Sequence, residues 1–146
     1  MSSKSRAFIA VHIAVLTVSD SRTKANDKSG DLLVSRLTNT GHVLADRKIV
    51  KDDLGQIRGV ISRWIDDTDI QVAITTGGTG VTGFDGTPEA IEPLLEKKLD
   101  GFGEIFRALS FEEIGTSALQ SRAMVIPDRR MLGQCPISAA WLCLFP

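Results

Sequence analysis

The chain has 146 residues, of which 42% are hydrophobic and 24% are charged, a composition typical of one globular domain with room for a core. Seventeen basic and eighteen acidic residues give a formal net charge of -1, which argues against a nucleic-acid-binding protein that works by neutralising phosphates. No apolar run reaches the roughly 20 residues that span a membrane, and no secretory signal is evident. The two cysteines form neither a zinc motif nor a disulfide framework. We therefore expect a cytoplasmic protein.

Strand-like and helix-like segments alternate along the first half of the chain. Residues 10–19 form a continuous apolar, β-rich run, which predicts a strand covered on both faces. A polar loop then leads to a predicted helix over residues 29–41. A second strand, a second helix and a third strand are predicted at residues 42–50, 53–67 and 70–76.

The second half is expected to be mainly helical. Thr87 begins a cap-and-first-turn pattern that predicts a helix as far as about Leu99, in which Pro93 should bend the helix or break a hydrogen bond. Residues 101–122 predict one or two helices, broken at Gly115. The alternation indicates a doubly wound α/β fold, in which ligands bind beyond the carboxyl ends of the strands.

A glycine-rich loop, TGGTGVTGFDG, follows the third predicted strand. Residues 78–83 match the spacing of the dinucleotide fingerprint, but the next helix begins too late and no acidic strand end follows about 20 residues on. The loop has no Gly-Lys-Ser/Thr, which excludes a P-loop. Because residues 77–86 exceed an ordinary connection of about 2–6 residues, we favour a cradle of backbone amides that binds an anion, with a plain tight connection as the alternative. The residues expected to bind phosphate are Thr75, Thr76, Gly77, Gly78, Thr79 and Gly80.

Two carboxylates are expected at the same edge of the sheet. Asp85 lies in the glycine loop and Asp52 follows the second strand, and a carboxylate beside bound phosphates is typically a magnesium ligand or a charge organiser. Each has an alternative role as a helix N-cap, which for the helix at 53–67 is shared between Asp52 and Asp53. Ser19, after the first strand, is a further candidate ligand at this edge, with a turn or cap as its alternative.

Together these segments resemble the MoaB/MogA family of molybdenum cofactor biosynthesis proteins, and are closer to its MoaB members. The similarity covers residues 9–124 and rests on an ordered set of motifs, LTVSDSR, DKSG, IVKDD, ITTGGTGVTGFDGTPEAI, GFGEIFR and SFEEIGTSALQSRA. The resemblance implies a three-layer α/β/α sandwich with a mostly parallel sheet, assembled as a homotrimer or homohexamer, that binds molybdopterin. MogA-like members adenylylate the terminal phosphate of that pterin with ATP and Mg²⁺. A member that only binds pterin, or a purine nucleotide such as GTP, would carry the same loop.

The resemblance also implies roles for particular residues. Asp52 and Asp85 correspond to functionally important aspartates of the family, which we expect to hold Mg²⁺ or to order the attacking phosphate. Residues 75–80 correspond to the phosphate-binding segment. Ser121 and Arg122 border the pterin pocket, which makes them candidate ligands.

The chain departs from the family pattern after Met124. The family continues with a buried strand, a second glycine-proline loop and a helix, whereas residues 125–146 show neither strand nor helix periodicity. A frameshift near Met124 would produce such a tail, and a lineage that rebuilt its end is the alternative. We therefore expect residues 1–146 to form a single molybdopterin-binding domain in which 125–146 is an atypical tail.

Overall fold

The computed structural model describes residues 7–94 and 100–122. Its elements are β1 (His12–Val18), α1 (Lys28–Asn39), β2 (Val43–Val50), α2 (Leu54–Asp66), β3 (Val72–Thr76), α3 (Thr87–Ile91), the 3-10 helix η1 (Glu92–Leu94), α4 (Asp100–Ile114) and the 3-10 helix η2 (Gly115–Gln120). The three predicted strands and the first two predicted helices are therefore present, with ends that differ from the prediction by no more than two residues. The atypical tail, residues 125–146, lies outside the described residues.

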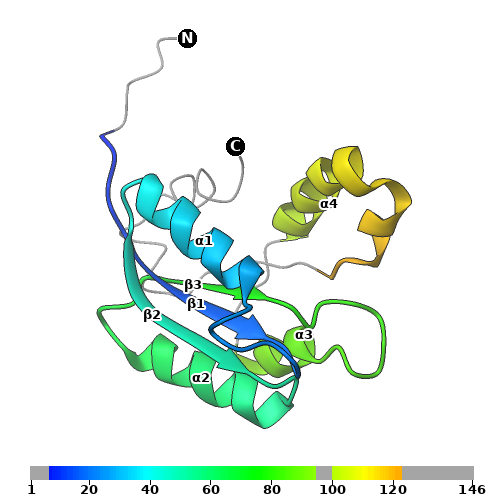
Figure 1. Ribbon diagram of the computed structural model, residues 1–146, viewed down its shortest axis with the longest axis horizontal. Coiled ribbons are helices and arrows are strands. Elements are labelled where there is room, and N and C mark those ends of the chain that lie inside the picture. The colour runs from blue at the N-terminus through cyan, green and yellow to red at the C-terminus, as the bar shows by residue number, and fades with distance from the viewer. Residues whose placement is uncertain (1–6, 95–99, 123–146) are drawn as a thin grey trace.

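The described strands form one parallel sheet in the order β2-β1-β3 (Figure 1). At the middle of β1, Leu16 pairs with Lys48 of β2 on one side and with Thr75 of β3 on the other. The side chains of β1 from Ile13 onward are buried, as expected for a strand covered on both faces. Because all three strands run the same way, their carboxyl ends meet at one edge of the sheet.

Helices cover both faces of the sheet, and alternate side chains of β1 enter the two resulting cores. The core beneath α2 and α3 contains Ala14, Leu16, Val18, Ile57, Val60, Ile61, Trp64 and Ala90. The core beneath α1 contains Val11, Ile13, Val15 and Leu37. Figure 1 shows α1 on one side of the sheet and α2 and α3 on the other. The three-layer α/β/α fold expected from the resemblance is confirmed.

Side-chain caps fix where α1 and α2 begin. Asp27 accepts a 3.0 Å hydrogen bond from the amide of Gly30, and Asp53 accepts a 2.8 Å bond from the amide of Gln56. Asp53 is thus the N-cap of α2, which leaves the neighbouring Asp52 side chain for other contacts.

The helix that follows the glycine loop is shorter than predicted. Gly86 occupies the N-cap position and Thr87 is the first helical residue, so the expectation that Thr87 caps the helix is wrong. The α-helix ends at Ile91 and continues only as η1, which contains Pro93. Proline lacks the N–H that an α-helix needs, which explains the early end. Residues 95–99, where the rest of this helix was predicted, lie outside the described residues.

The α4–η2 arm lies beside the three-layer body (Figure 1). Gly115, with φ +61°, separates the two helices, which confirms the predicted break. Phe102 and Phe106 stack with ring centroids 5.9 Å apart. The arm also exposes Ile105, Leu109, Phe111, Ile114 and Leu119. In the part of the chain that the structure describes, no helix is both long and apolar enough to cross a bilayer.

Candidate functional site

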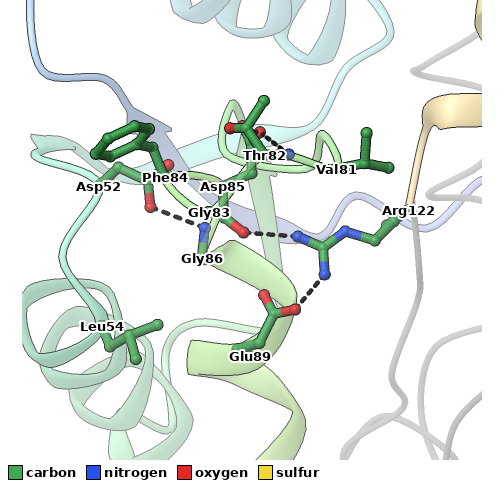
Figure 2. Close-up of a pocket in the computed structure, with 10 residues that line it drawn as sticks. All are labelled: Asp52, Leu54, Val81, Thr82, Gly83, Phe84, Asp85, Gly86, Glu89 and Arg122. Atoms are coloured by element: carbon green, nitrogen blue, oxygen red, sulfur yellow. Dashed lines mark hydrogen bonds and ion pairs between the residues drawn. The ribbon is translucent and has the colours of Figure 1, made fainter.

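An open cavity of about 540 Å³ lies against the glycine loop, beyond the carboxyl ends of the strands (Figure 2). Its walls are formed by Asp52, Leu54, Val81, Thr82, Gly83, Phe84, Asp85, Gly86, Glu89 and Arg122. Three of the predicted site residues, Asp52, Asp85 and Arg122, therefore line the same cavity.

The glycines that open the loop are required by its backbone. Gly77 and Gly78 have φ angles of +94° and +65°, which favour glycine. A Cβ on Gly77 would lie 2.1 Å from the carbonyl oxygen of Val18. The loop is closed by Thr87, whose hydroxyl donates to the Gly77 carbonyl at 2.9 Å and whose amide donates to the Gly78 carbonyl at 3.0 Å. These two glycines therefore serve a tight connection, whatever the loop binds.

The carboxylate of Asp85 lies inside the curve of the loop. It accepts hydrogen bonds from the amide of Thr82 at 3.0 Å and from the Thr82 hydroxyl at 2.5 Å. The Thr82 hydroxyl, followed by the Thr82 and Gly80 amides, holds the pKa of the Asp85 carboxyl below its ordinary value. No described residue accepts a hydrogen bond from the amides of Gly78 or Thr79. Part of the amide cradle thus holds the loop's own carboxylate, and the amides of Gly78 and Thr79 are among those left to bind a ligand.

Asp52 joins the end of β2 to the end of the loop. Its Oδ1 accepts a 3.0 Å hydrogen bond from the amide of Gly86, and its own amide donates to Asp20 at 3.1 Å. Its Oδ2 faces Gly78, where an added Cβ would lie 2.9 Å from that oxygen. Asp52 therefore has one oxygen in a structural bond and a second oxygen directed at the start of the loop.

Arg122 fastens the loop from the end of η2 (Figure 2). Its Nε donates to the carbonyl of Gly80 at 2.7 Å, its Nη2 donates to the carbonyl of Asp85 at 2.6 Å, and its Nη1 forms an ion pair with Glu89. Its backbone amide donates to the Thr79 carbonyl at 3.1 Å. The ion pair lowers the pKa of the Glu89 carboxyl. Arg122 borders the cavity, as the resemblance implies, but each of its side-chain nitrogens already holds a protein acceptor.

The other predicted ligands do not line this cavity. Ser19 accepts hydrogen bonds from the amides of Ser21 and Arg22, at 3.3 and 3.2 Å, which matches the turn that was its alternative role. The Ser121 carbonyl accepts a bond from Arg107 at 3.2 Å. Thr75 and Thr76 are the last residues of β3. Thr79 contacts the wall residue Arg122 through its backbone carbonyl, which accepts a hydrogen bond from the Arg122 amide.

The described residues contain no group of three or more His, Cys, Asp or Glu side chains that could hold a metal ion. Three carboxylates nevertheless border the cavity, and two of them, those of Asp52 and Asp85, are not paired with Arg122. Mg²⁺ commonly takes one or two carboxylates and completes its shell with water and substrate phosphates. The donor set therefore fits Mg²⁺ delivered with a phosphate ligand, and does not fit a metal held by the protein alone.

Seven residues of the cavity wall were not among the predicted site residues, and Glu89 and Phe84 are two of them. Glu89 pairs with Arg122, which lies 33 positions later in the sequence. Local sequence patterns do not predict a contact between residues so far apart in the chain. Phe84 offered a signal, since it is a large apolar residue in an otherwise small and polar loop.

Comparison with known proteins identifies the family. The sequence profile of the family described as "Probable molybdopterin binding domain" matches residues 14–136. The chain belongs to this family. The molybdopterin-binding domain is 50% identical over 124 residues to Molybdenum cofactor biosynthesis protein B of Escherichia coli strain K12, covering 85% of this chain and 73% of that protein. The protein of the same name from Bacillus subtilis is 46% identical over 114 residues, or 77% of this chain and 67% of that protein.

Solved structures agree with this assignment. A crystal structure of a Molybdenum cofactor biosynthesis protein B matches with a TM-score of 0.77 and 43% identity, covering 82% of this chain and 74% of that one. The tungsten cofactor synthesizing protein MoaB from Pyrococcus furiosus matches with a TM-score of 0.73 and 38% identity, covering 84% and 78%. The MoaB/MogA family expected from the motifs is therefore confirmed for this chain.

Proposed function

We propose that this domain binds molybdopterin and adenylylates its terminal phosphate with Mg-ATP. The observation that supports this most directly is the arrangement of the loop. The amides of Gly78 and Thr79 have no acceptor among the described residues, Oδ2 of Asp52 faces Gly78, and the Asp85 carboxylate lies beside Gly80. Amides that point into one concavity bind phosphate oxygens without a cationic side chain.

Adenylyl transfer needs no nucleophile from the protein. An oxygen of the pterin's terminal phosphate attacks the α-phosphorus of ATP, the bond from that phosphorus to the bridging oxygen breaks, and pyrophosphate leaves. Among the described residues, the wall of the cavity contains no Ser, Cys, His or Lys, and the hydroxyl of Thr82 is directed at Asp85. The protein's contribution is then to hold two anionic groups in line, which is the work of a rigid loop.

Magnesium fits the charge of the cavity. Of the described residues that line it, three are carboxylates, Asp52, Asp85 and Glu89, and one is a cation, Arg122. A bare polyphosphate would be repelled by this set, whereas a phosphate-bound divalent ion would be attracted. Asp52 and Asp85 would hold the ion, which neutralises phosphate charge during transfer.

The alternative is a protein that binds pterin or GTP without transferring a nucleotide. Incubation with molybdopterin, Mg²⁺ and either ATP or GTP separates the two functions, because only transfer releases pyrophosphate. We expect release with ATP, and we expect Asp52→Asn to abolish it. Asp53→Asn is the matched control, since that neighbour caps α2 and lies outside the cavity wall. Tight binding with no pyrophosphate from the wild type would establish the binding function instead.

We also propose that the domain assembles as a homotrimer or homohexamer. The exposed apolar side chains of α4 include Ile105 and Leu109, which are 51% and 38% exposed and lie four residues apart on the helix. Side chains at this spacing share one helix face, and a contiguous exposed apolar face commonly marks a protein–protein contact.

A further inference from the structure

Phe84 is the most exposed large apolar side chain among the described residues, at 85%. It lies on the wall of the cavity, beside Asp52 in Figure 2. Within the described residues, its ring stacks on no other aromatic ring. An aromatic face left in water is unfavourable unless a ligand or partner covers it.

The backbone that carries Phe84 is held on both sides. The amide of Asp85 donates to the Thr82 carbonyl at 3.1 Å, and the carbonyl of Asp85 is held by Arg122. The amide of Gly86 is held by Asp52. The ring is therefore presented from a fixed backbone, which reduces the entropy lost when a ligand binds to it.

Polar groups for phosphate and an apolar face thus occur on one cavity. The polar groups of the wall include the carboxylates of Asp52 and Asp85, and Oδ2 of Asp52 faces Gly78 at the start of the loop. The apolar groups are the Phe84 ring and the side chains of Val81 and Leu54, which are 65% and 45% exposed. A ligand that satisfies both has a flat ring system joined to phosphate.

We propose that Phe84 is a specificity-determining residue that stacks on the planar heterocycle of a phosphate-bearing ligand of this cavity. Two sources share that chemistry, the purine base of ATP and the pterin ring of molybdopterin. The inference rests on the proposed function, and it adds a ring-recognition role that no backbone amide or carboxylate supplies. Base–aromatic stacking is strong enough to matter for affinity and tolerates changes of base.

Calorimetric titration of the full chain tests this with four ligands in the presence of Mg²⁺: ATP, GTP, molybdopterin and inorganic tripolyphosphate. Phe84→Ala and Phe84→Leu should weaken the stacked ligand about tenfold and leave tripolyphosphate unchanged. Phe84→Trp should retain or improve affinity, because it keeps the aromatic face. Leu32→Ala is the control, since it removes an exposed apolar side chain of α1 that does not line the cavity.

The outcomes separate the inference from the function on which it rests. Loss of ATP and GTP affinity identifies the purine as the stacked ring, and loss of molybdopterin affinity identifies the pterin. If Phe84→Ala matches Leu32→Ala for all ligands, or weakens tripolyphosphate equally, the stacking role is wrong while the proposed function stands. A change of oligomeric mass on Phe84→Ala would assign the ring to a subunit contact and overturn the inference. A wild type that binds none of the four ligands would overturn the proposed function as well.

Discussion

The guanidinium of Arg122 donates a 2.6 Å hydrogen bond from Nη2 to the backbone carbonyl of Asp85, 37 positions earlier in the chain. The same side chain holds the carbonyl of Gly80 and pairs with Glu89. The loop that carries a candidate metal-binding carboxylate is therefore fixed by a residue from the end of the α4–η2 arm. Its geometry depends on that arm as well as on the sheet.

Arg122→Lys should impair the site although it keeps the positive charge. An ammonium group cannot reproduce the fork with which the guanidinium reaches three acceptors. We expect Arg122→Lys and Arg122→Ala alike to raise the Kd for Mg-ATP about tenfold, which corresponds to about 1.4 kcal/mol. Hydrogen exchange should become faster at residues 78–85.

Arg107→Lys is the control for this experiment, because Arg107 bonds to the Ser121 carbonyl and does not line the cavity. A lysine variant of Arg122 with wild-type affinity would show that charge alone is needed.

The acid limb of activity should depend on Thr82. Hydrogen bonds from the Thr82 hydroxyl and amide lower the pKa of Asp85, so the carboxylate stays ionised to a lower pH than an ordinary aspartate. Thr82→Val removes the hydroxyl donor and should therefore move the acid limb of pyrophosphate release to higher pH. Thr82→Ser keeps the donor and should leave the limb in place. Identical limbs in the two variants would rule out a role for ionised Asp85.

Asp27 should make the fold sensitive to acid. Its buried carboxylate accepts bonds from Thr17 and Arg47, both at 2.8 Å, and caps α1. Burial raises the pKa of Asp27, but the bonds from Arg47 and Thr17 outweigh it, so the net pKa is lowered. A carboxyl whose folded pKa is depressed stabilises the fold above its unfolded pKa, and this contribution is lost as pH falls through the folded pKa.

Urea unfolding across acidic pH measures this effect. Asp27→Ala should cost about 3 kcal/mol of unfolding free energy near neutral pH, because it leaves the partly buried Arg47 without its main partner. The cost should shrink as pH falls. Asp31→Asn is the control, since Asp31 is the exposed partner of Arg47 and should contribute less than about 1 kcal/mol. A loss for Asp27→Ala that is constant with pH would contradict the ionised pairing.

The assembly should depend on the apolar face of α4. Ile105→Glu places a charge in that face and should shift the protein from trimer or hexamer toward monomer in native mass spectrometry. Glu104→Gln changes an exposed polar residue of the same helix that lies off this face, and should leave the mass unchanged. Wild-type protein that is monomeric at all concentrations would contradict the proposed assembly.

The central elements could be predicted because their signals are local. The apolar run of β1 indicates burial on both faces, and the helical spacing of Ile57, Val60 and Trp64 indicates the buried side of α2. The glycine loop was placed correctly beyond β3. Its first two glycines, however, are required by their positive φ angles and by close contact with Val18. The sequence alone does not distinguish this structural requirement for glycine from a requirement for ligand binding.

Long-range contacts account for the rest. The bonds of Arg122 to Gly80 and Asp85 join residues 42 and 37 positions apart, so the sequence indicates a basic residue near the site without indicating that its side chain is engaged. The role of Thr87 was misjudged for the same reason. A threonine before proline resembles a helix cap, but its hydroxyl is used by the carbonyl of Gly77 across the loop.

The central claim is that backbone amides at the start of the glycine loop bind a phosphate of the ligand. Titration of ¹⁵N-labelled protein with Mg-ATP tests it directly, by following the amide resonances of the loop. We expect the amides of Gly78 and Thr79 to show the largest downfield shifts, with smaller changes at Gly80 and Thr82, whose amides already donate to Asp85. Saturable binding with shifts confined to other parts of the chain, and none at Gly78 or Thr79, would contradict it.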